Sequence, residues 1–135
     1  MMARYLLDTD ICIYVLKRRS PGLMARFDRL RPGEAVISTI AFGELAFGAS
    51  KSGSPDAARA HLQALTTVAA IEPVPVEAAA HYAEIRHGLE TKGTPIGGND
   101  LWIAAHAKAA KLTLVTNNER EFRRVSGLKV QNWSR

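Results

Sequence analysis

Short apolar runs alternate along the chain with longer segments in which apolar residues recur every three or four positions. The runs are short enough for buried strands and predict them at residues 4–7, 34–38, 70–72, 112–115 and 128–130. The helical spacing predicts long helices over 10–17, 39–50, 76–92, 100–111 and 117–125, and further helices after Pro21-Gly22 and from Ser54-Pro55-Asp56. Strands that alternate with helices are typical of a parallel sheet covered on both faces. We therefore expect an α/β/α fold, with a short parallel sheet sandwiched between helices in one domain over residues 1–135.

Composition narrows the class of protein. The 135 residues are 47% hydrophobic and 23% charged, as in an ordinary globular domain. No apolar run approaches the roughly 20 residues of a membrane span, and the first residues lack an apolar signal core. The single cysteine, Cys12, cannot form an intrachain disulfide, so we expect a cytoplasmic protein with no membrane contact. A net charge of +5 makes a polyanion such as nucleic acid a plausible partner.

Two carboxylates stand out in the first half of the chain. Asp8 follows the first predicted strand, where functional groups of open α/β sheets gather, although it could equally cap the next helix. Glu44 lies in the least polar stretch, residues 40–48, on a predicted helical face with Ile40 and Phe47. A carboxylate in apolar surroundings is costly and favours a cation partner. The alternative for Glu44 is an exposed position on the flank of the helix.

Further acids occur in the second half. Asp100 follows Gly97-Gly98-Asn99 and begins a predicted helix, where it is either an N-cap or a ligand-binding group. After the fourth predicted strand, Thr116 and Glu119 have the spacing of a capping box, and so do Asn118 and Glu121. One of the two glutamates is then structural, while the other faces the site.

Carboxylates at strand ends suit a hard divalent cation, because Mg²⁺ and Mn²⁺ prefer oxygen ligands. The four histidines do not combine with a cysteine pair into a zinc pattern, and we expect them on the surface or on helix faces. No phosphate-binding loop of the Walker type is present in the sequence.

Four motifs in this order resemble those of PIN-domain proteins, most closely the VapC toxins of bacterial toxin–antitoxin pairs. They are Leu6-Leu7-Asp8-Thr9-Asp10, the run Ile37 to Ile40 leading to Gly43-Glu44-Leu45, Gly98-Asn99-Asp100, and Val115-Thr116-Asn117-Asn118 through Phe122. The resemblance covers essentially the whole chain and includes the Asn132-Trp133 ending.

This resemblance implies an endoribonuclease that binds Mg²⁺ or Mn²⁺, forms a homodimer and is inhibited by a small VapB-like antitoxin. The toxin–antitoxin complex would repress its own operon, so operator DNA would be contacted only through that complex. Asp8, Glu44 and Asp100 match the three acidic positions of the family, and Asp8 and Asp100 would bind the metal. The Thr-x-Asn form departs from the Thr-x-Asp pattern of the family, with Glu121 as the preferred substitute and Glu119 as the alternative. Relatives with a Thr-Asn-Asn stretch include enzymes that cleave initiator transfer RNA.

In the expected mechanism, Glu44 binds the metal or orients a water, and Thr116 and Asn118 position phosphate or water by hydrogen bonds. Residues 17–19 and Arg120, Arg123 and Arg124 are candidates for holding the RNA backbone. Two other functions remain open from the sequence. Asp8-Thr9-Asp10 at a strand end also resembles the nucleophile pair of haloacid-dehalogenase-type phosphatases, although Asp100 follows no strand as that family requires. A non-catalytic RNA-binding or interaction module is the second alternative.

Overall fold

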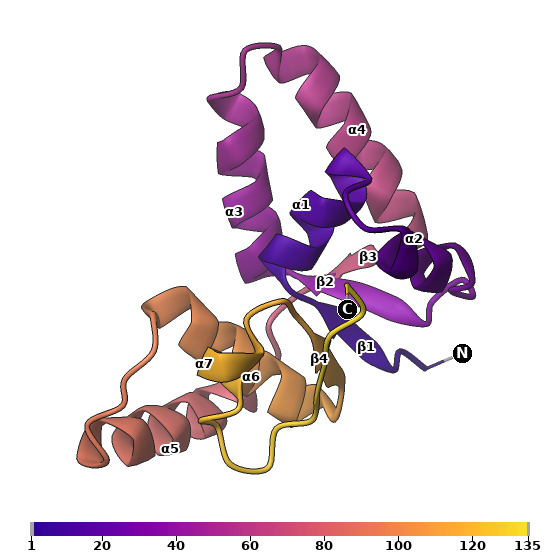
Figure 1. The fold of residues 1–135 in the computed structure, drawn as a ribbon. Coiled ribbons are helices and arrows are strands. Elements are labelled where there is room, and N and C mark those ends of the chain that lie inside the picture. The colour runs from indigo at the N-terminus through magenta and orange to yellow at the C-terminus, as the bar shows by residue number, and fades with distance from the viewer. Residues whose placement is uncertain (1, 135) are drawn as a thin grey trace.

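The computed structural model describes residues 2–134 and contains a five-stranded, entirely parallel sheet (Figure 1). Its strands lie in the order β3-β2-β1-β4-β5. Their bounds are β1 Tyr5–Leu7, β2 Ala35–Ser38, β3 Ala70–Glu72, β4 Thr113–Val115 and β5 Val130–Gln131. The apolar runs predicted these strands because the central ones are covered on both faces, and every residue of β1 and β2 is buried.

Helices cover both faces of the sheet, which confirms the predicted α/β/α class. In Figure 1, α1, α3 and α4 gather on one side of the sheet, and α5, α6 and α7 on the other. The seven helices found in residues 2–134 are α1 Thr9–Lys17, α2 Pro21–Asp28, α3 Thr39–Ser50, α4 Pro55–Val68, α5 Ala78–Thr91, α6 Gly98–Ala110 and α7 Glu119–Phe122. Among residues 2–134, none of these helices combines the length and the apolar character needed to cross a bilayer.

The last helix is shorter than the predicted segment 117–125. The backbone N–H of Asn117 donates to Asp10, and that of Asn118 donates to the hydroxyl of Thr116. Because both donors are bonded to side chains, these residues form a loop, and α7 begins only at Glu119.

The face of α3 that packs against the core also differs from the prediction. Its buried residues are Ala41, Leu45 and Ala49, whereas Phe47 is 65% exposed and Glu44 is half-buried. Apolar residues occur all around this helix, so periodicity alone could not identify the face that meets the sheet and α4. The predicted face with Ile40, Glu44 and Phe47 was therefore wrong.

One histidine also contradicts the sequence-based expectation. His106 on α6 is fully buried, and its Nε2 lies 3.2 Å from the Oε1 of Glu72 at the end of β3. A helix that packs against both the sheet and α5 has little exposed surface, and the carboxylate of Glu72 is the partner of one ring nitrogen. The other nitrogen, Nδ1, is buried and has no hydrogen-bond partner among residues 2–134.

The strand order places a topological switch point between β1 and β4. The chain adds β2 and β3 on one side of β1 and then crosses to add β4 and β5 on the other. In open parallel sheets, the loops that leave the two strands at such a point diverge and open a crevice beyond the carboxyl ends of the strands. This edge is where the candidate site lies.

Candidate active site

The pairing of β1 with β4 brings Asp8 and Thr116 together. Leu7 is the register partner of Val115, so the next residue on each strand emerges at the same edge of the sheet. The backbone N–H of Asp8 donates to the carbonyl of Val115 at 2.9 Å, and the Thr116 hydroxyl donates to the Oδ2 of Asp8 at 2.8 Å. Both side chains are buried. Two candidate residues that are distant in sequence are thus in direct contact.

Asp8 is also the N-cap of α1, where its Oδ1 accepts the backbone N–H of Thr9 at 2.8 Å. The sequence had left open whether Asp8 is this cap or a functional group. Burial raises the pKa of Asp8 to about 7, aided by the neighbouring charge of Asp10, and outweighs the hydrogen bonds from Thr116 and Thr9. Asp8 can be both the N-cap of α1 and a member of the functional site, since its two oxygens have different partners.

Asp10 joins the site although it was not among the predicted site residues. Its Oδ1 accepts the backbone N–H of Asn117 at 3.3 Å and lies 3.5 Å from the Thr116 hydroxyl. Burial raises its pKa despite those hydrogen bonds. The spacing in Asp8-Thr9-Asp10 could have signalled this role, because the first turn of a helix at a strand end carries both acids toward the neighbouring strand end.

Glu44 reaches the same edge from α3. Its Oε1 accepts the hydroxyl of Thr9 at 2.6 Å, which connects α3 to the first turn of α1. The negative charge of Glu44 also contributes to the raised pKa values of Asp8 and Asp100. Glu44 is therefore neither a freely exposed flank residue nor buried in apolar surroundings, and it is part of the acidic cluster.

Asp100 lies in the first turn of α6 but does not cap it, because Gly97 is the N-cap residue. Burial, the charge of Asp8 and the proximity of Glu121 raise the pKa of Asp100 to about 7. The N-cap interpretation of Asp100 is thus wrong. The position directs this carboxyl at the other acids, so the structure brings it into one cluster with Asp8 and Glu44.

Glu121 faces the cluster from α7. One oxygen accepts the side-chain amide of Asn118 at 2.8 Å, and the other accepts the backbone N–H of Gly97 at 3.3 Å. Burial acts to raise the pKa of Glu121, but these hydrogen bonds and one donated by the Asp100 carboxyl lower it. The proximity of the two carboxyl groups therefore acts in opposite directions, raising the pKa of Asp100 and lowering that of Glu121.

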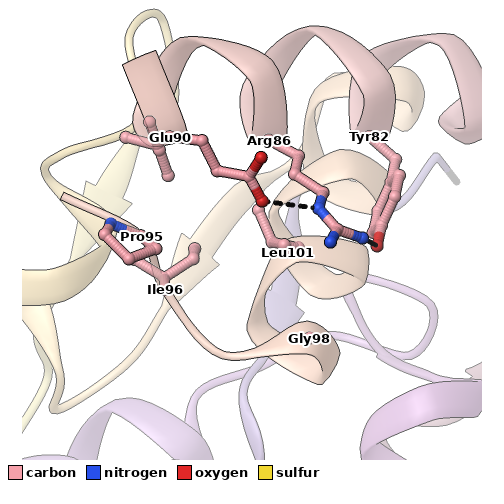
Figure 2. Close-up of a pocket in the computed structure, with 8 residues that line it drawn as sticks. Tyr82, Arg86, Glu90, Pro95, Ile96, Gly98 and Leu101 are labelled. Carbon is pink, nitrogen blue, oxygen red and sulfur yellow. Dashed lines mark hydrogen bonds and ion pairs between the residues drawn. The ribbon is translucent and has the colours of Figure 1, made fainter. Parts of the chain in front are cut away.

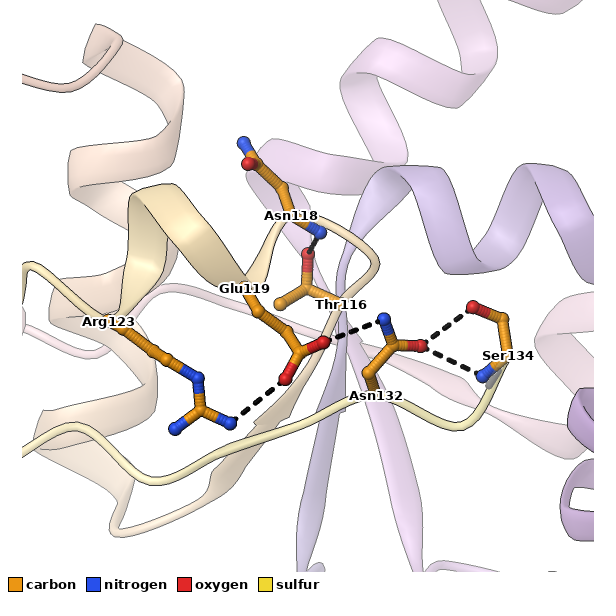
Figure 3. A network of polar contacts seen from close by, with 6 residues as sticks. All are labelled: Thr116, Asn118, Glu119, Arg123, Asn132 and Ser134. Carbon is orange, nitrogen blue, oxygen red and sulfur yellow. Dashed lines mark hydrogen bonds and ion pairs between the residues drawn. The ribbon is translucent and has the colours of Figure 1, made fainter.

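Glu119 points away from the cluster, toward the C-terminal segment (Figure 3). Its carboxylate accepts from Asn132 at 3.0 Å and from Arg123 at 2.9 Å. Asn132 in turn accepts the backbone N–H of Ser134 at 2.9 Å, and the Ser134 hydroxyl donates to Asn117. Of the two glutamates that the sequence left open, Glu119 anchors the C-terminal segment and Glu121 meets Asp100.

The acidic cluster comprises Asp8, Asp10, Glu44, Asp100 and Glu121. None of the ion pairs found within residues 2–134 involves any of its members. The raised pKa values of Asp8, Asp10 and Asp100 mean that their surroundings disfavour the charged forms, and a cation among them would offset that cost. An all-oxygen donor set is the kind that hard divalent cations prefer.

The donors have the right chemistry for such a cation, but they are not arranged as a finished site. Within residues 2–134, no group of three or more His, Cys, Asp or Glu side chains is positioned to hold a metal ion. Several of the oxygens accept hydrogen bonds from Thr9, Thr116 and Asn118 instead. A bound cation would have to draw the carboxylates closer together.

The basic residues singled out in the sequence do not form one patch. Arg123 is paired with Glu119, Arg124 donates to the Pro95 carbonyl at 3.1 Å, and Arg19 lies over the ring of Tyr14. Lys17 lines a groove between α1, α3 and α4. Arg120 is exposed, and it directly precedes Glu121 of the acidic cluster in the sequence.

The sequence is similar to known proteins along nearly its whole length. The sequence matches the PIN domain family over residues 5–128. It is 41% identical to ribonuclease VapC2 of Haemophilus influenzae over 98% of this chain and 99% of that protein. It is 38% identical to the tRNA(fMet)-specific endonuclease VapC of Shigella flexneri, over 98% of this chain and the whole of that protein.

The solved structures give the same result. The DNA-bound VapBC structure from Salmonella typhimurium contains a chain that superposes with a TM-score of 0.91 at 36% identity, covering 98% of this chain and 99% of that one. The phosphatase interpretation is therefore wrong, as the loop before Asp100 already indicated. The chain belongs to the PIN-domain family and, within it, to the VapC ribonucleases.

Proposed function

We propose that this protein is the toxin of a type II toxin–antitoxin pair and cleaves RNA in a divalent-metal-dependent reaction at the acidic cluster. The observation that carries the proposal is the convergence of Asp8, Glu44, Asp100 and Glu121 at the switch point of the sheet. Mutually repelling carboxylates are costly to keep in one place unless a cation uses them. The family membership of the chain supports the same activity.

Asp8 and Asp100 would hold the metal, Mg²⁺ or Mn²⁺, with Glu44 and Glu121 beside it. When bound, such an ion lowers the pKa of a water and neutralises charge on phosphoryl oxygens. Thr116 fixes the orientation of Asp8, and Thr9 fixes that of Glu44. Asn118 holds Glu121 and, with Thr116, is placed to position phosphate or water. Asp10 holds the loop at Asn117, so it acts as a positioning residue.

The substrate is RNA, and transfer RNA is the first class to test. A relative at 38% identity is named a tRNA(fMet)-specific endonuclease, and another at 36% from Salmonella typhimurium carries the same name. The excess of positive charge elsewhere on the chain favours a polyanion despite the acidic cluster. We expect the protein to act in the cytoplasm, where its substrate lies.

The partner that inhibits it is a VapB-like antitoxin. Similar chains occur in VapBC complexes, including one from Rickettsia felis bound to promoter DNA. Here, a groove of about 350 Å³ between α1, α3 and α4 is lined by Ile13, Leu16, Leu45, Ala58 and Leu62. Glu44 belongs both to this groove and to the acidic cluster.

An apolar antitoxin segment in this groove would therefore place an Arg or Lys at the cluster, where it substitutes for the charge of the metal. We therefore propose the α1–α3–α4 groove, which Phe47 does not line, as the anchor of this segment. The toxin itself would form a homodimer, and operator DNA would be contacted through the antitoxin complex.

The decisive experiment incubates purified, antitoxin-free protein with total cellular RNA in Mg²⁺, in Mn²⁺ or in EDTA. We expect discrete cleavage products with either metal and none in EDTA. Asp100→Asn should abolish cleavage, whereas Asp56→Asn, which makes the same change at an exposed position on α4, should not. Cleavage that persists in EDTA, or that survives in Asp100→Asn, would contradict the proposal. Binding of RNA without cleavage would favour a non-catalytic module.

A further inference from the structure

A second pocket lies beside the acidic cluster, on the other side of the loop that precedes α6. It has a volume of about 150 Å³ and is enclosed by α5, the loop at Pro95 and Ile96, and the first turn of α6 (Figure 2). Its lining is mixed, with apolar walls and an ion pair at the rim. The mechanism above uses none of these side chains.

The walls of the pocket are flat and held in place. Tyr82, which lines it, is stacked on Trp102 with ring centroids 4.1 Å apart and planes 18° from parallel. Leu89, Ile96 and Leu101 are buried and form the base. The guanidinium carbon of Arg86 also lies over the Tyr82 ring, 6.0 Å from its centroid, so the ring is held from two sides. A fixed aromatic ring beside a guanidinium is the kind of wall that RNA-binding proteins use to contact unpaired bases.

The rim carries one cation and one anion in a fixed arrangement. Arg86 donates from Nε to Glu90 at 2.8 Å and from Nη1 to the Tyr82 hydroxyl at 2.9 Å, as Figure 2 shows. Each of the two charged side chains is about half exposed, so both can reach a ligand at the mouth. The guanidinium keeps further N–H groups beyond these two bonds, and the carboxylate keeps its second oxygen.

Two adjacent glycines connect this pocket to the acidic cluster. Gly98 lines the pocket, while the N–H of Gly97 donates to Glu121. A Cβ on Gly97 would lie 3.8 Å from Oδ2 of Asp100, so Gly97 is in contact with the cluster. Arg124 bridges the same gap, because it donates to the carbonyl of Pro95 and its charge acts on Glu121. A group in the pocket and a phosphate at the cluster are thus neighbours.

We propose that this pocket binds a guanine base of the RNA substrate, next to the phosphate that is cleaved. The inference rests on the proposed ribonuclease function and deepens it by naming a base subsite. Guanine presents two adjacent donors, N1–H and the 2-amino group, beside the acceptor O6. Glu90 accepts from the donors and Arg86 donates to O6, while Tyr82 contacts the ring. Adenine lacks this donor pair, and uracil presents only one N–H between two acceptors.

The first test measures base preference with short single-stranded RNAs that carry guanine, inosine or adenine at one position beside the cleaved bond. Inosine lacks only the 2-amino group. We expect the wild type to prefer guanine over inosine by about tenfold in kcat/KM, the usual scale for one bidentate base contact. Glu90→Gln should remove that preference by lowering kcat/KM most for guanine RNA, less for inosine RNA, which keeps N1–H, and least for adenine RNA, which has neither donor.

Glu84→Gln is the matched control, because it makes the same change on the same helix at an exposed position outside the pocket. An unchanged preference in Glu90→Gln, or an equal loss in Glu84→Gln, would overturn the base subsite. Absence of cleavage by the wild type would instead count against the ribonuclease function.

The second test does not depend on catalysis. Metal-free Asp100→Asn protein is irradiated with RNA that contains one 6-thioguanosine, and the crosslinked peptide is identified by mass spectrometry. We expect crosslinks within residues 82–98. These crosslinks should be lost in the double variant that carries both Asp100→Asn and Glu90→Gln. Crosslinks that form only outside residues 82–98 would refute the pocket as the base subsite. If free guanosine monophosphate prevents the crosslink as well as unlabelled RNA does, the pocket is a mononucleotide site, which would also refute the proposal.

Discussion

The hydroxyl of Thr116 donates to the Oδ2 of Asp8 over 2.8 Å and joins two residues that are 108 positions apart in the chain. The hydroxyl oxygen of Thr116 also accepts the backbone N–H of Asn118 at 2.9 Å. A single buried hydroxyl thereby fixes both the first acid of the cluster and the loop that leads to Glu121. The arrangement exists because β1 and β4 are adjacent at the switch point.

Thr116→Val should lower stability by about 1–3 kcal/mol. Valine has the shape of threonine but leaves the N–H of Asn118 without its acceptor and the Oδ2 of Asp8 without its donor. Urea unfolding at pH 7 measures the change. Thr116→Ser keeps the hydroxyl and serves as the control, with a smaller loss expected. If Val and wild type unfold at the same urea concentration, the hydroxyl does not hold this loop.

The metal-free protein should lose stability as the pH rises from about 4 through about 7. Asp8 and Asp100 have pKa values of about 7 in the folded chain, against 3.8 ordinarily. In that window the folded state binds more protons than the unfolded state, so raising the pH favours unfolding. For buried Asp8 the loss is on the order of 3 kcal/mol, and for half-exposed Asp100 it is smaller. Unfolding in EDTA at pH 5 and pH 8 should show a smaller difference for Asp8→Asn than for the wild type.

Mg²⁺ or Mn²⁺ should raise the melting temperature, and more so at pH 8 than at pH 5. Protons and the cation compete for Asp8 and Asp100, whose pKa values of about 7 lie between the two conditions. Ligand at 100 times its Kd stabilises by about 2.7 kcal/mol. Asp100→Asn should show little response. If neither metal changes the melting temperature of the wild type at pH 8, the acidic cluster does not bind a divalent cation.

Replacement by Asn and by Ala should separate capping from catalysis. Asp8→Asn and Asp100→Asn should both abolish RNA cleavage with unchanged circular dichroism, because an amide is a poor metal ligand of similar shape. Asp8→Ala should be about 1 kcal/mol less stable than Asp8→Asn, since it removes the cap of α1. Asp100→Ala should match Asp100→Asn, because Gly97 caps α6. Full activity in either Asn variant would remove that residue from the mechanism.

A charge placed in the α1–α3–α4 groove should block the antitoxin without affecting cleavage. Ala58 lines the groove and Ala60, two positions further along α4, is exposed outside it. We expect Ala58→Glu to weaken antitoxin inhibition at least about tenfold, as a buried unpaired charge would, and Ala60→Glu to leave it unchanged. Titration of RNA cleavage with antitoxin gives both values. Equal inhibition of the two variants would place the antitoxin elsewhere.

The fold was largely predictable from local pattern. Apolar runs such as Leu6-Leu7 and Val36-Ile37 indicated strands covered on both sides, because only a sheet between helices buries both faces of a strand. Boundaries were less predictable where side chains compete for backbone groups, as at Asn117 and Asn118. The buried face of α3 was not predictable, since apolar residues occur all around it.

For the site, the sequence by itself determined that Asp8 follows a strand and that Asp100 opens a helix, which made both of them candidates. Glu44 became a candidate from its apolar neighbours in the middle of a helix, although the helix face predicted for it was wrong. Only the tertiary structure decided their partners. Whether Glu119 or Glu121 meets Asp100 depends on the rotation of a four-residue helix, which is fixed by Asn132 on one side and by Gly97 on the other. Asp10 enters the cluster because the loop after β4 bonds to it. The spacing of Asp8 and Asp10 could have placed Asp10 at this edge of the sheet, but not its partner. Such contacts join segments far apart in the chain, so no local period in the sequence identifies which residues meet.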